Sequence, residues 1–246
     1  MSNQQEFNEQ ENTQKQEDLQ KRIQDFYRID EITWSSIQDL GNGILVYRDV
    51  LPTSMDIIKR LEDVLEDPDN PYEYSDAMVG YGMKIPEYRD CRDFKYKKSD
   101  IAEHTGDAAE KLRQLWDDVY FRQLQAVKHY CKMHNIGELR YWEAMNFVRY
   151  GEGQHFQEHH DNGYSYNCVL SAVSYPNDDY EGGELFFRLQ NLNVKPKAGD
   201  LYLFPSNFMY PHRAMPVHSG VKYSIVTMLD YSDKYHKPEF YAETGS

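Results

Sequence analysis

The sequence FQEHHDNG, residues 156–163, places a histidine and an aspartate two positions apart, just before a turn. Side chains at positions i and i+2 of an extended strand point to the same face. His159 and Asp161 would therefore present an imidazole nitrogen and a carboxylate oxygen together, while His160 would point the other way. The Asn-Gly pair that follows is a turn signal. The stretch predicts a β-strand whose end carries two potential metal ligands.

A metal site built from His159 and Asp161 needs a third ligand from elsewhere in the chain. Two histidines and one carboxylate on one triangular face of an octahedral ion, with other positions open, form the ligand set of non-haem iron(II) centres. The chain supplies a late histidine, His212, ten residues before Lys222. Alone, the H-x-D triplet is a weak signal, because the chain has nine histidines and a polar strand end has the same composition.

The same residues also match a competing motif. His155 to His159 reads H-x-x-E-H, the inverted zinc-protease motif, which requires a helix that brings both histidines to one face. Gly151 and Gly153 precede the motif and Asp-Asn-Gly follows it at residues 161–163. These residues leave little room for a helix, so the sequence disfavours a protease.

Length and composition predict a folded protein with one main domain. The chain has 246 residues, of which 40% are hydrophobic and 14% aromatic, which is enough to bury a sizeable core. The formal net charge of −14 argues against partners such as nucleic acids or anionic membranes, because both would repel the chain. The basic residues within positions 89–98 alternate with aspartates, as on a solvated face or edge strand.

Cysteine usage and the amino-terminal sequence indicate a compartment. The three cysteines, Cys91, Cys131 and Cys168, are widely separated and odd in number, so they predict neither a disulfide framework nor a zinc ribbon. The chain begins without an apolar leader-like segment, and it contains no apolar run of membrane-spanning length. We expect a cytoplasmic protein, and the sequence does not indicate its oligomeric state.

The first half of the chain divides into a tail and a helical part. Residues 1–22 are rich in Gln, Glu, Asn and Lys and predict a tail that is either disordered or a fraying helix. Residues 23–138 form a part that we expect to pack on the core. It contains a predicted strand pair around Gly41-Asn42-Gly43, amphipathic helices near residues 54–66 and 108–133, and a long loop region with short strands over residues 69–100.

From residue 139 onward the pattern changes to short strands between turn signals. Residues 139–235 are the predicted core, and residues 236–246 are a carboxy-terminal tail. The fold class is mainly β with flanking helices, arranged as a sandwich or jelly roll. The predicted strands are residues 139–150, 165–175, 184–189, 193–195, 200–204 and 222–230.

The region from Tyr150 to Asp230 resembles the 2-oxoglutarate and Fe(II)-dependent oxygenases, in particular the prolyl 4-hydroxylase-like branch. Several blocks match in the order and spacing of that family. They are Tyr150, GQHF (153–156), HHD (159–161), YEGGELFF (180–187), PKAGDLYLFPS (196–206) and residues 212–223.

This resemblance implies a double-stranded β-helix core in which His159, Asp161 and His212 bind iron. It implies that Lys222 pairs with the distal carboxylate of 2-oxoglutarate, in agreement with the cost of burying an unpaired carboxylate. Tyr150 and Tyr175 match positions of cosubstrate-facing tyrosines. The implied cofactor is Fe(II), the cosubstrates are 2-oxoglutarate and dioxygen, and ascorbate is compatible with this chemistry.

The activity implied by the resemblance is hydroxylation of a substrate C–H bond, with a prolyl residue of a peptide or protein as the leading substrate. Two alternatives stay open, a dioxygenase acting on a non-prolyl substrate and a catalytically silent metal-binding jelly roll. Many family members have a tryptophan where this chain has Met228, which favours a differently shaped pocket. Residues 72–98 form a candidate lid over the substrate, because long loops in compact domains are often functional.

Overall fold

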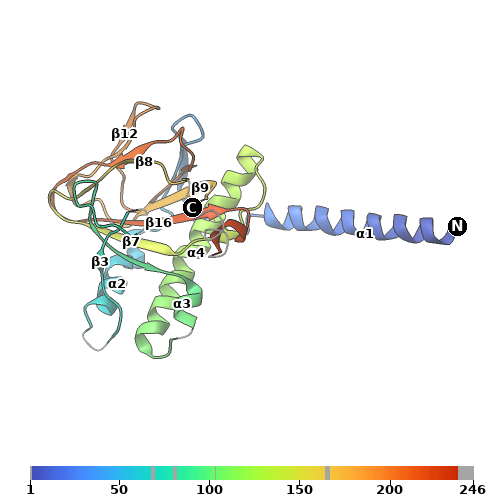
Figure 1. Ribbon diagram of the computed structural model, residues 1–246, viewed down its shortest axis with the longest axis horizontal. Helices are drawn as coiled ribbons and strands as arrows, with labels where there is room; N and C mark the ends of the chain where they lie inside the picture. The colour runs from blue at the N-terminus through green and yellow to red at the C-terminus, as the bar shows by residue number, and fades with distance from the viewer. Residues whose placement is uncertain (1, 68–69, 80–81, 103, 164–166, 238–246) are drawn as a thin grey trace.

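Most strands of the chain join one large antiparallel sheet (Figure 1). The computed structural model describes residues 2–67, 70–79, 82–102, 104–163 and 167–237. The strand order is β1-β2-β13-β9-β16-β7-β5-β3, and β6 also pairs with β16. These strands are β1 (Ser36–Asp39), β2 (Leu45–Arg48), β3 (Ser75–Asp76), β5 (Arg92–Tyr96), β6 (Tyr141–Trp142), β7 (Met145–Tyr150), β9 (Leu170–Tyr175), β13 (Asp200–Pro205) and β16 (Lys222–Asp230).

A smaller five-stranded sheet faces the inner side of the large one. Its order is β12-β11-β14-β8-β4, and a two-stranded ribbon of β10 and β15 accompanies it. Two antiparallel sheets closed around a shared core form a jelly roll, which confirms the predicted fold class. The strands are β4 (Arg89–Asp90), β8 (His155–His159), β10 (Glu181–Gly182), β11 (Leu185–Phe187), β12 (Leu192–Val194), β14 (His212–Ala214) and β15 (Val217–Ser219).

The large sheet is buried on both faces, because its central strands alternate between two cores. On β13, Leu201 and Leu203 pack in the cluster on the helix side, whereas Tyr202 and Phe204 belong to the cluster between the sheets. Alternation with a period of two is what a strand imposes. Along β16 the same rule places Lys222, Ser224, Val226 and Met228 on the inner face, where they line the cavity between the sheets.

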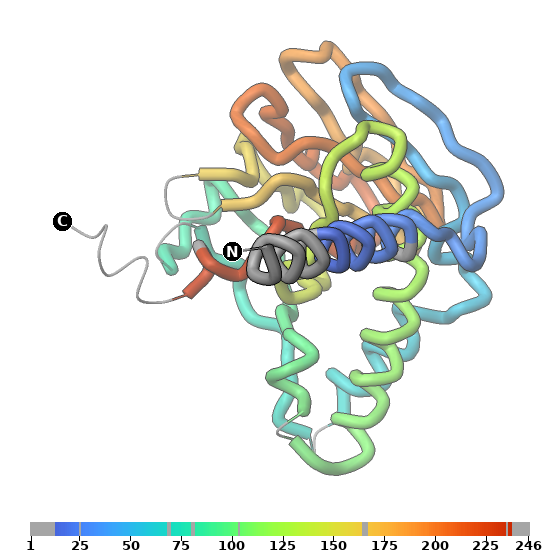
Figure 2. The backbone as a smooth tube through the Cα atoms, turned by 90° about the vertical axis from the view of Figure 1, so that its right-hand side faces the viewer, coloured from blue at the N-terminus to red at the C-terminus, as the bar shows by residue number. Residues whose placement is uncertain are grey.

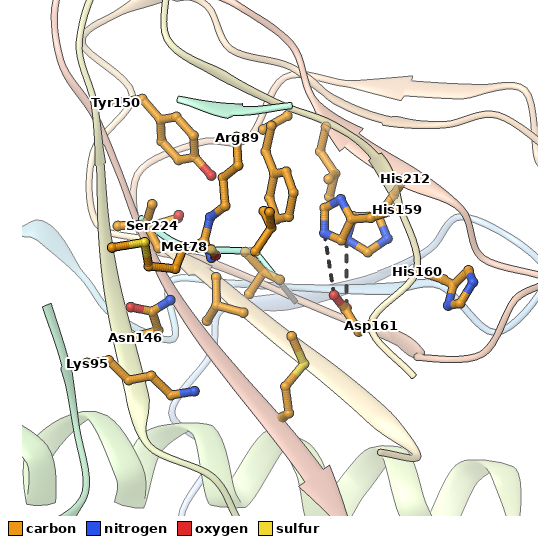
Figure 3. Close-up of a pocket in the computed structure, with 18 of the residues that line it drawn as sticks. Met78, Arg89, Lys95, Asn146, Tyr150, His159, His160, Asp161, His212 and Ser224 are labelled. Atoms are coloured by element: carbon orange, nitrogen blue, oxygen red, sulfur yellow. Dashed lines mark hydrogen bonds and ion pairs between the residues drawn. The ribbon is translucent and has the colours of Figure 1, made fainter. Parts of the chain in front are cut away.

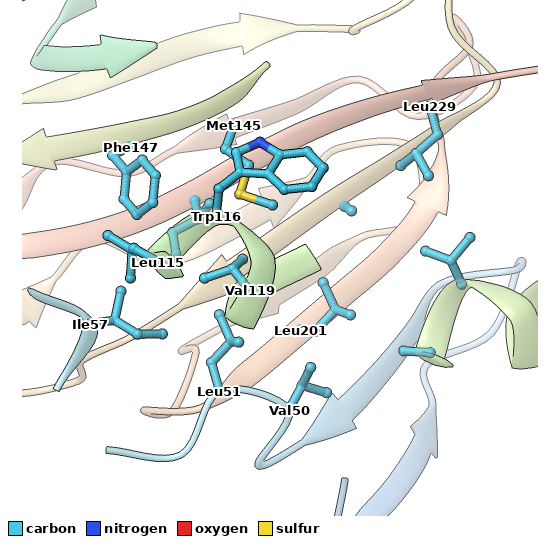
Figure 4. Packing of buried hydrophobic residues seen from close by; sticks show 14 of the residues in the cluster. Val50, Leu51, Ile57, Leu115, Trp116, Val119, Met145, Phe147, Leu201 and Leu229 are labelled. Atoms are coloured by element: carbon cyan, nitrogen blue, oxygen red, sulfur yellow. The ribbon is translucent and has the colours of Figure 1, made fainter. Parts of the chain in front are cut away.

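Helices cover the outer face of the large sheet. The long helix α4 (Asp107–His134) places Leu115, Trp116 and Val119 against sheet residues such as Met145 and Phe147 (Figure 4). Two shorter helices pack beside it, α2 (Ile57–Leu65) and α3 (Lys98–Ala102). The chain also forms two 3₁₀ turns, η1 (Thr53–Met55) and η2 (Lys234–His236). Strands from before residue 138 are also built into both sheets, because β5 pairs with β7 and β4 with β8.

The amino-terminal segment is a long helix. Residues predicted as a disordered or fraying helical tail belong to α1 (Ser2–Phe26), which extends away from the rest of the molecule in Figure 1 and is seen nearly end-on in Figure 2. Glu, Gln and Lys are good helix formers, so intrinsic propensity accounts for the helix where little can be buried. The side chains of residues 13–24 are exposed.

One predicted strand differs from the structure, since the strand predicted over residues 139–150 is interrupted between β6 and β7. The short strands predicted within the loop region, residues 69–100, are β3, β4 and β5. Residues 165–166 of one predicted strand and residues 238–246 of the predicted tail lie outside the described residues. Within the described part of the chain, the helices fall short of the length and apolarity needed to cross a bilayer.

Candidate metal and cosubstrate site

Strand pairing in the smaller sheet brings His159 and His212 together. β14 runs antiparallel to β8, and its first residue, His212, lies directly opposite His159, the last residue of β8. Asp161 follows in the bend beyond β8. The ligand atoms of these three residues lie within 4.8 Å of one another, and Figure 3 shows them converging at one end of a cavity. The structure therefore assembles the three predicted ligands at one point.

Hydrogen bonds to the backbone set the same tautomer in both imidazoles. Nδ1 of His159 lies 2.8 Å from the carbonyl oxygen of Gln157, and Nδ1 of His212 lies 3.0 Å from that of Tyr210. A carbonyl accepts only, so each Nδ1 must carry a proton and donate it. The Nε2 atoms are therefore left as lone-pair donors, which is the form in which histidine binds a metal.

Asp161 supplies the negative charge of the group. Burial would raise the pKa of its carboxyl, but the His212 and His159 side chains and the Ser171 hydroxyl together hold that pKa far below its usual value. The two carboxylate oxygens lie 3.5 Å from Nε2 of His159 and 3.7 Å from Nε2 of His212. Burial also lowers the pKa of His212 to about 4. Near neutral pH the group therefore combines a carboxylate with a neutral His212.

The donor set fits a divalent iron ion. Two imidazole nitrogens and one carboxylate oxygen, gathered at one end of an open cavity, leave positions free for other ligands, as in the facial triads of non-haem Fe(II) oxygenases. The nearby histidines do not join this group among the described residues. The ring nitrogens of His155 lie near the carbonyls of Gly153 and Glu87, and Nδ1 of His160 contacts the carbonyl of Asn162.

The competing protease motif is excluded by its backbone. His155 and His159 both lie in strand β8, whereas the H-x-x-E-H motif needs them one helical turn apart on one face. The sequence prediction against a protease is thereby supported.

The cysteines Cys91, Cys131 and Cys168 are all buried and free.

The three ligands line a cavity of about 640 Å³, and Lys222 lines it as well. Lys222 is 1% exposed, and its Nζ donates to the carbonyl of Gly183 at 2.7 Å. Among the described residues, no carboxylate forms an ion pair with it. Burial and the nearby charge of Lys195 lower the pKa of Lys222 to about 7. The cavity thus contains a buried lysine whose amine pairs with none of the described carboxylates.

Tyr150 and Tyr175 flank this lysine. Each ring centroid lies 5.3 Å from Nζ of Lys222, so both rings face the charged end of the cavity. Burial raises the pKa of each phenol well above its ordinary value. The Tyr150 hydroxyl is hydrogen-bonded to Cys91, which reduces its capacity to contact a ligand. Their predicted contact with a cosubstrate stays a prediction.

Sequence reasoning missed a polar part of the cavity wall. Asn146 lies on β7 opposite Lys95 of β5, and Nζ of Lys95 pairs with Glu143 at 2.5 Å. All three residues line the cavity with Met228. Nothing in the local sequence marks this group, because β-sheet register brings it together. The basic cluster was interpreted as a solvated face or edge strand, and Lys95, whose side chain is 48% exposed, also contributes to the cavity wall.

Comparisons with known proteins agree with this geometry. Residues 145–229 match the 2OG-Fe(II) oxygenase superfamily. A curated relative named a putative prolyl 4-hydroxylase, from Acanthamoeba polyphaga mimivirus, is 27% identical over 146 residues, which cover 51% of this chain and 60% of that protein. The match thus spans about 60% of the relative's length.

Solved structures share the fold. A Trichoplax adhaerens prolyl hydroxylase, in complex with a hypoxia inducible factor peptide fragment, superposes with a TM-score of 0.59 and 16% identity, covering 85% of this chain and 91% of that one. A Pseudomonas putida prolyl-4-hydroxylase gives a TM-score of 0.53 and 20% identity, covering 76% and 92%. A viral collagen prolyl hydroxylase from Paramecium bursaria Chlorella virus 1, in complex with 2OG, gives 0.53 and 15%, covering 77% and 96%.

Proposed function

Because residues 145–229 form a domain of the 2OG-Fe(II) oxygenase superfamily, we propose that the protein is a 2-oxoglutarate- and Fe(II)-dependent dioxygenase. In this proposal His159, Asp161 and His212 hold the iron. The bound metal would supply the oxidative chemistry. In that reaction 2-oxoglutarate and dioxygen are consumed, succinate and CO₂ are released, and a substrate C–H bond is hydroxylated. The work of the chain is to bind, orient and shield the reactants.

The observation that carries the proposal is Lys222. A buried lysine without a counter-ion is costly, and this one opens on the cavity that holds the three metal ligands. A dicarboxylate that reaches from the metal to Lys222 would supply the missing negative charge. A jelly roll that binds only a metal or a sugar has no need of this cation. We therefore assign Lys222 to the distal carboxylate of 2-oxoglutarate.

We further propose a peptidyl substrate, with proline as the hydroxylated residue. Two observations support it. The relatives that match this chain include proteins named prolyl hydroxylases, one of them in complex with a peptide fragment. The cavity wall beyond the metal also combines donors and acceptors in Asn146 and the Lys95–Glu143 pair, and an extended main chain offers both kinds of group.

The predicted lid over residues 72–98 is retained in a narrower form. Met78 and Val79 line the cavity, and the Met78 side chain is 47% exposed at its edge. By contrast, residues 92–96 form β5 inside the large sheet and Arg89–Asp90 form β4 beside β8. Removing the whole segment would disrupt both sheets, so we propose that the substrate-covering part is the neighbourhood of Met78 and Val79.

The test is succinate formation from 2-oxoglutarate by protein that is loaded with Fe(II) anaerobically and then exposed to air. His159→Ala and Lys222→Ala serve as variants, and a pool of proline-containing peptides is added or omitted. Turnover that requires both residues and rises with peptide would support the whole proposal. Turnover that peptide does not change would keep the oxygenase and remove the prolyl substrate. Iron binding without turnover under any condition would favour a silent metal-binding module.

A further inference from the structure

Two buried hydroxyl groups form a hydrogen-bonded line that ends at Asp161. The Ser171 hydroxyl lies 2.5 Å from Oδ2 of Asp161 and 2.7 Å from the hydroxyl of Ser206. Both serines are at most 1% exposed, and a buried hydroxyl is costly unless it is hydrogen-bonded.

The direction of these hydrogen bonds follows from their chemistry. An ionised carboxylate accepts and cannot donate, so the single hydroxyl proton of Ser171 must point to Asp161. Ser206 must then donate to Ser171. Both hydroxyl protons therefore point toward the carboxylate. Such aligned chains polarise one another, and 2.5 Å is typical of a charge-assisted O–H···O⁻ bond.

The fold holds this line in place through the two central strands of the large sheet. Ser171 is on β9, directly opposite Phe204 of β13, and Ser206 follows the end of β13. The backbone carbonyl of Ser206 also accepts from the amide of Asn162, at 2.9 Å. Both the side chain of Asp161 and the backbone that follows it are therefore anchored to the same rigid strands.

We propose that Ser171, supported by Ser206, is a positioning residue for the metal ligand Asp161. Its hydroxyl occupies Oδ2, so that Asp161 offers Oδ1 to the ion as a single ligand and keeps the remaining positions open. The proposal rests on the metal-binding role proposed above. Hydrogen-bonding partners of metal ligands commonly change metal affinity 10–100-fold when removed, as an order of magnitude.

Strand β9 itself supplies the matched control. Ser174 is as buried as Ser171, but its hydroxyl lies on the helix side of the sheet, 3.0 Å from Nε2 of Gln123. Ser171→Ala and Ser174→Ala each remove one buried, hydrogen-bonded hydroxyl from the same strand. A general loss of stability would affect both, whereas only the first variant touches Asp161. Ser171→Thr keeps the hydroxyl and serves as the rescue variant.

The experiment uses the full-length protein and Co(II), and it measures the dissociation constant by titration and the visible absorption of the bound ion. Ser171→Ala should weaken Co(II) binding roughly 10–100-fold and change the absorption spectrum. Ser206→Ala should have a smaller effect in the same direction, while Ser174→Ala should match the wild type, and Ser171→Thr should largely restore it. Thermal unfolding of the metal-free proteins measures the stability that each variant loses.

Two results would overturn the inference. If Ser171→Ala and Ser174→Ala bind Co(II) with equal affinity and equal spectra, Ser171 does not position Asp161, although the metal site itself stands. If the wild-type protein does not bind Co(II), the metal role of Asp161 fails, and the positioning role fails with it.

Discussion

Lys222 makes the affinity for a dicarboxylate depend on pH in a defined direction. Burial and the charge of Lys195 lower its pKa to about 7 in the unliganded protein, so this lysine loses its proton as pH rises through that value. Only the charged form pairs with a carboxylate, which means that binding above pH 7 must take up a proton. By linkage, the affinity falls with rising pH over the range in which the complex holds more protons than the free protein.

We therefore expect 2-oxoglutarate to bind the Zn(II)-loaded protein with constant affinity below about pH 7 and up to about tenfold more weakly per pH unit above it. Isothermal titration between pH 6 and pH 9 measures this dependence. Lys222→Met should bind roughly 10–100-fold more weakly, the range for a hydrogen bond to a charged group, and should lose the pH dependence. An unchanged wild-type affinity across this range would contradict the assignment.

The pairing of β5 with β7 places Lys95, an exposed lysine, at the wall of the cavity. Lys95 is opposite Asn146 in the sheet and forms an ion pair with Glu143, at 2.5 Å, in the cavity wall. Lys98 of α3 makes a similar pair with Asp117 at 2.5 Å, and the two lysine side chains are 48% and 50% exposed. Lys98 does not line the cavity, so the two pairs differ chiefly in position.

Lys95→Met should therefore raise KM for a peptide substrate several-fold, because exposed ion pairs and rim contacts are worth about 1 kcal/mol or less. Lys98→Met should leave KM unchanged. Steady-state hydroxylation assays by mass spectrometry compare the two, and peptide-independent conversion of 2-oxoglutarate should be the same in both. Equal KM values for the two variants would show that this part of the cavity wall does not contribute to substrate recognition.

Helix α1 is long, but its side chains from residue 13 to residue 24 are exposed. The helix extends away from the sheets (Figure 1). Stability of a helix in a protein comes mainly from packing an apolar face. Deleting residues 2–22 should therefore change the midpoint of thermal unfolding by less than about 2 °C, with unchanged Co(II) binding. A large fall in the midpoint would show that α1 docks on the body in solution.

Sequence patterns predict the parts of this molecule that depend on near neighbours. Alternation along β13 and β16 and the helical stripe of α4 are local, and so is the proximity of His159 and Asp161, two positions apart. His212 was assigned through family resemblance, because its place opposite His159 depends on the pairing of β14 with β8. The structure brings the three together, while their binding of iron stays a prediction.

The features that sequence reasoning missed all depend on register between distant strands. Ser171 meets Asp161 only because β9 and β13 hold it against the bend after β8. Lys95 faces the cavity only because β5 pairs with β7. A slip of one residue in either register would turn the side chain to the other face. Local composition does not reveal strand register, and so the basic cluster around Lys95 was interpreted as a solvated face or edge strand.

The charge of the whole molecule should act on how fast substrates reach the cavity. A formal net charge of −14 attracts cationic partners at distances up to a Debye length, which is about 30 Å at 0.01 M salt and about 8 Å at 0.15 M. For two peptides with the same central proline, one flanked by lysines and one by glutamates, we expect the lysine peptide to have the higher kcat/KM at low salt. The ratio should be at least about tenfold and should fall toward unity as salt is raised, with kcat nearly unchanged. Measuring kcat/KM for both peptides at both salt concentrations separates two explanations of the preference. A preference that persists at high salt would have to come from contacts inside the cavity and not from the field of the acidic surface.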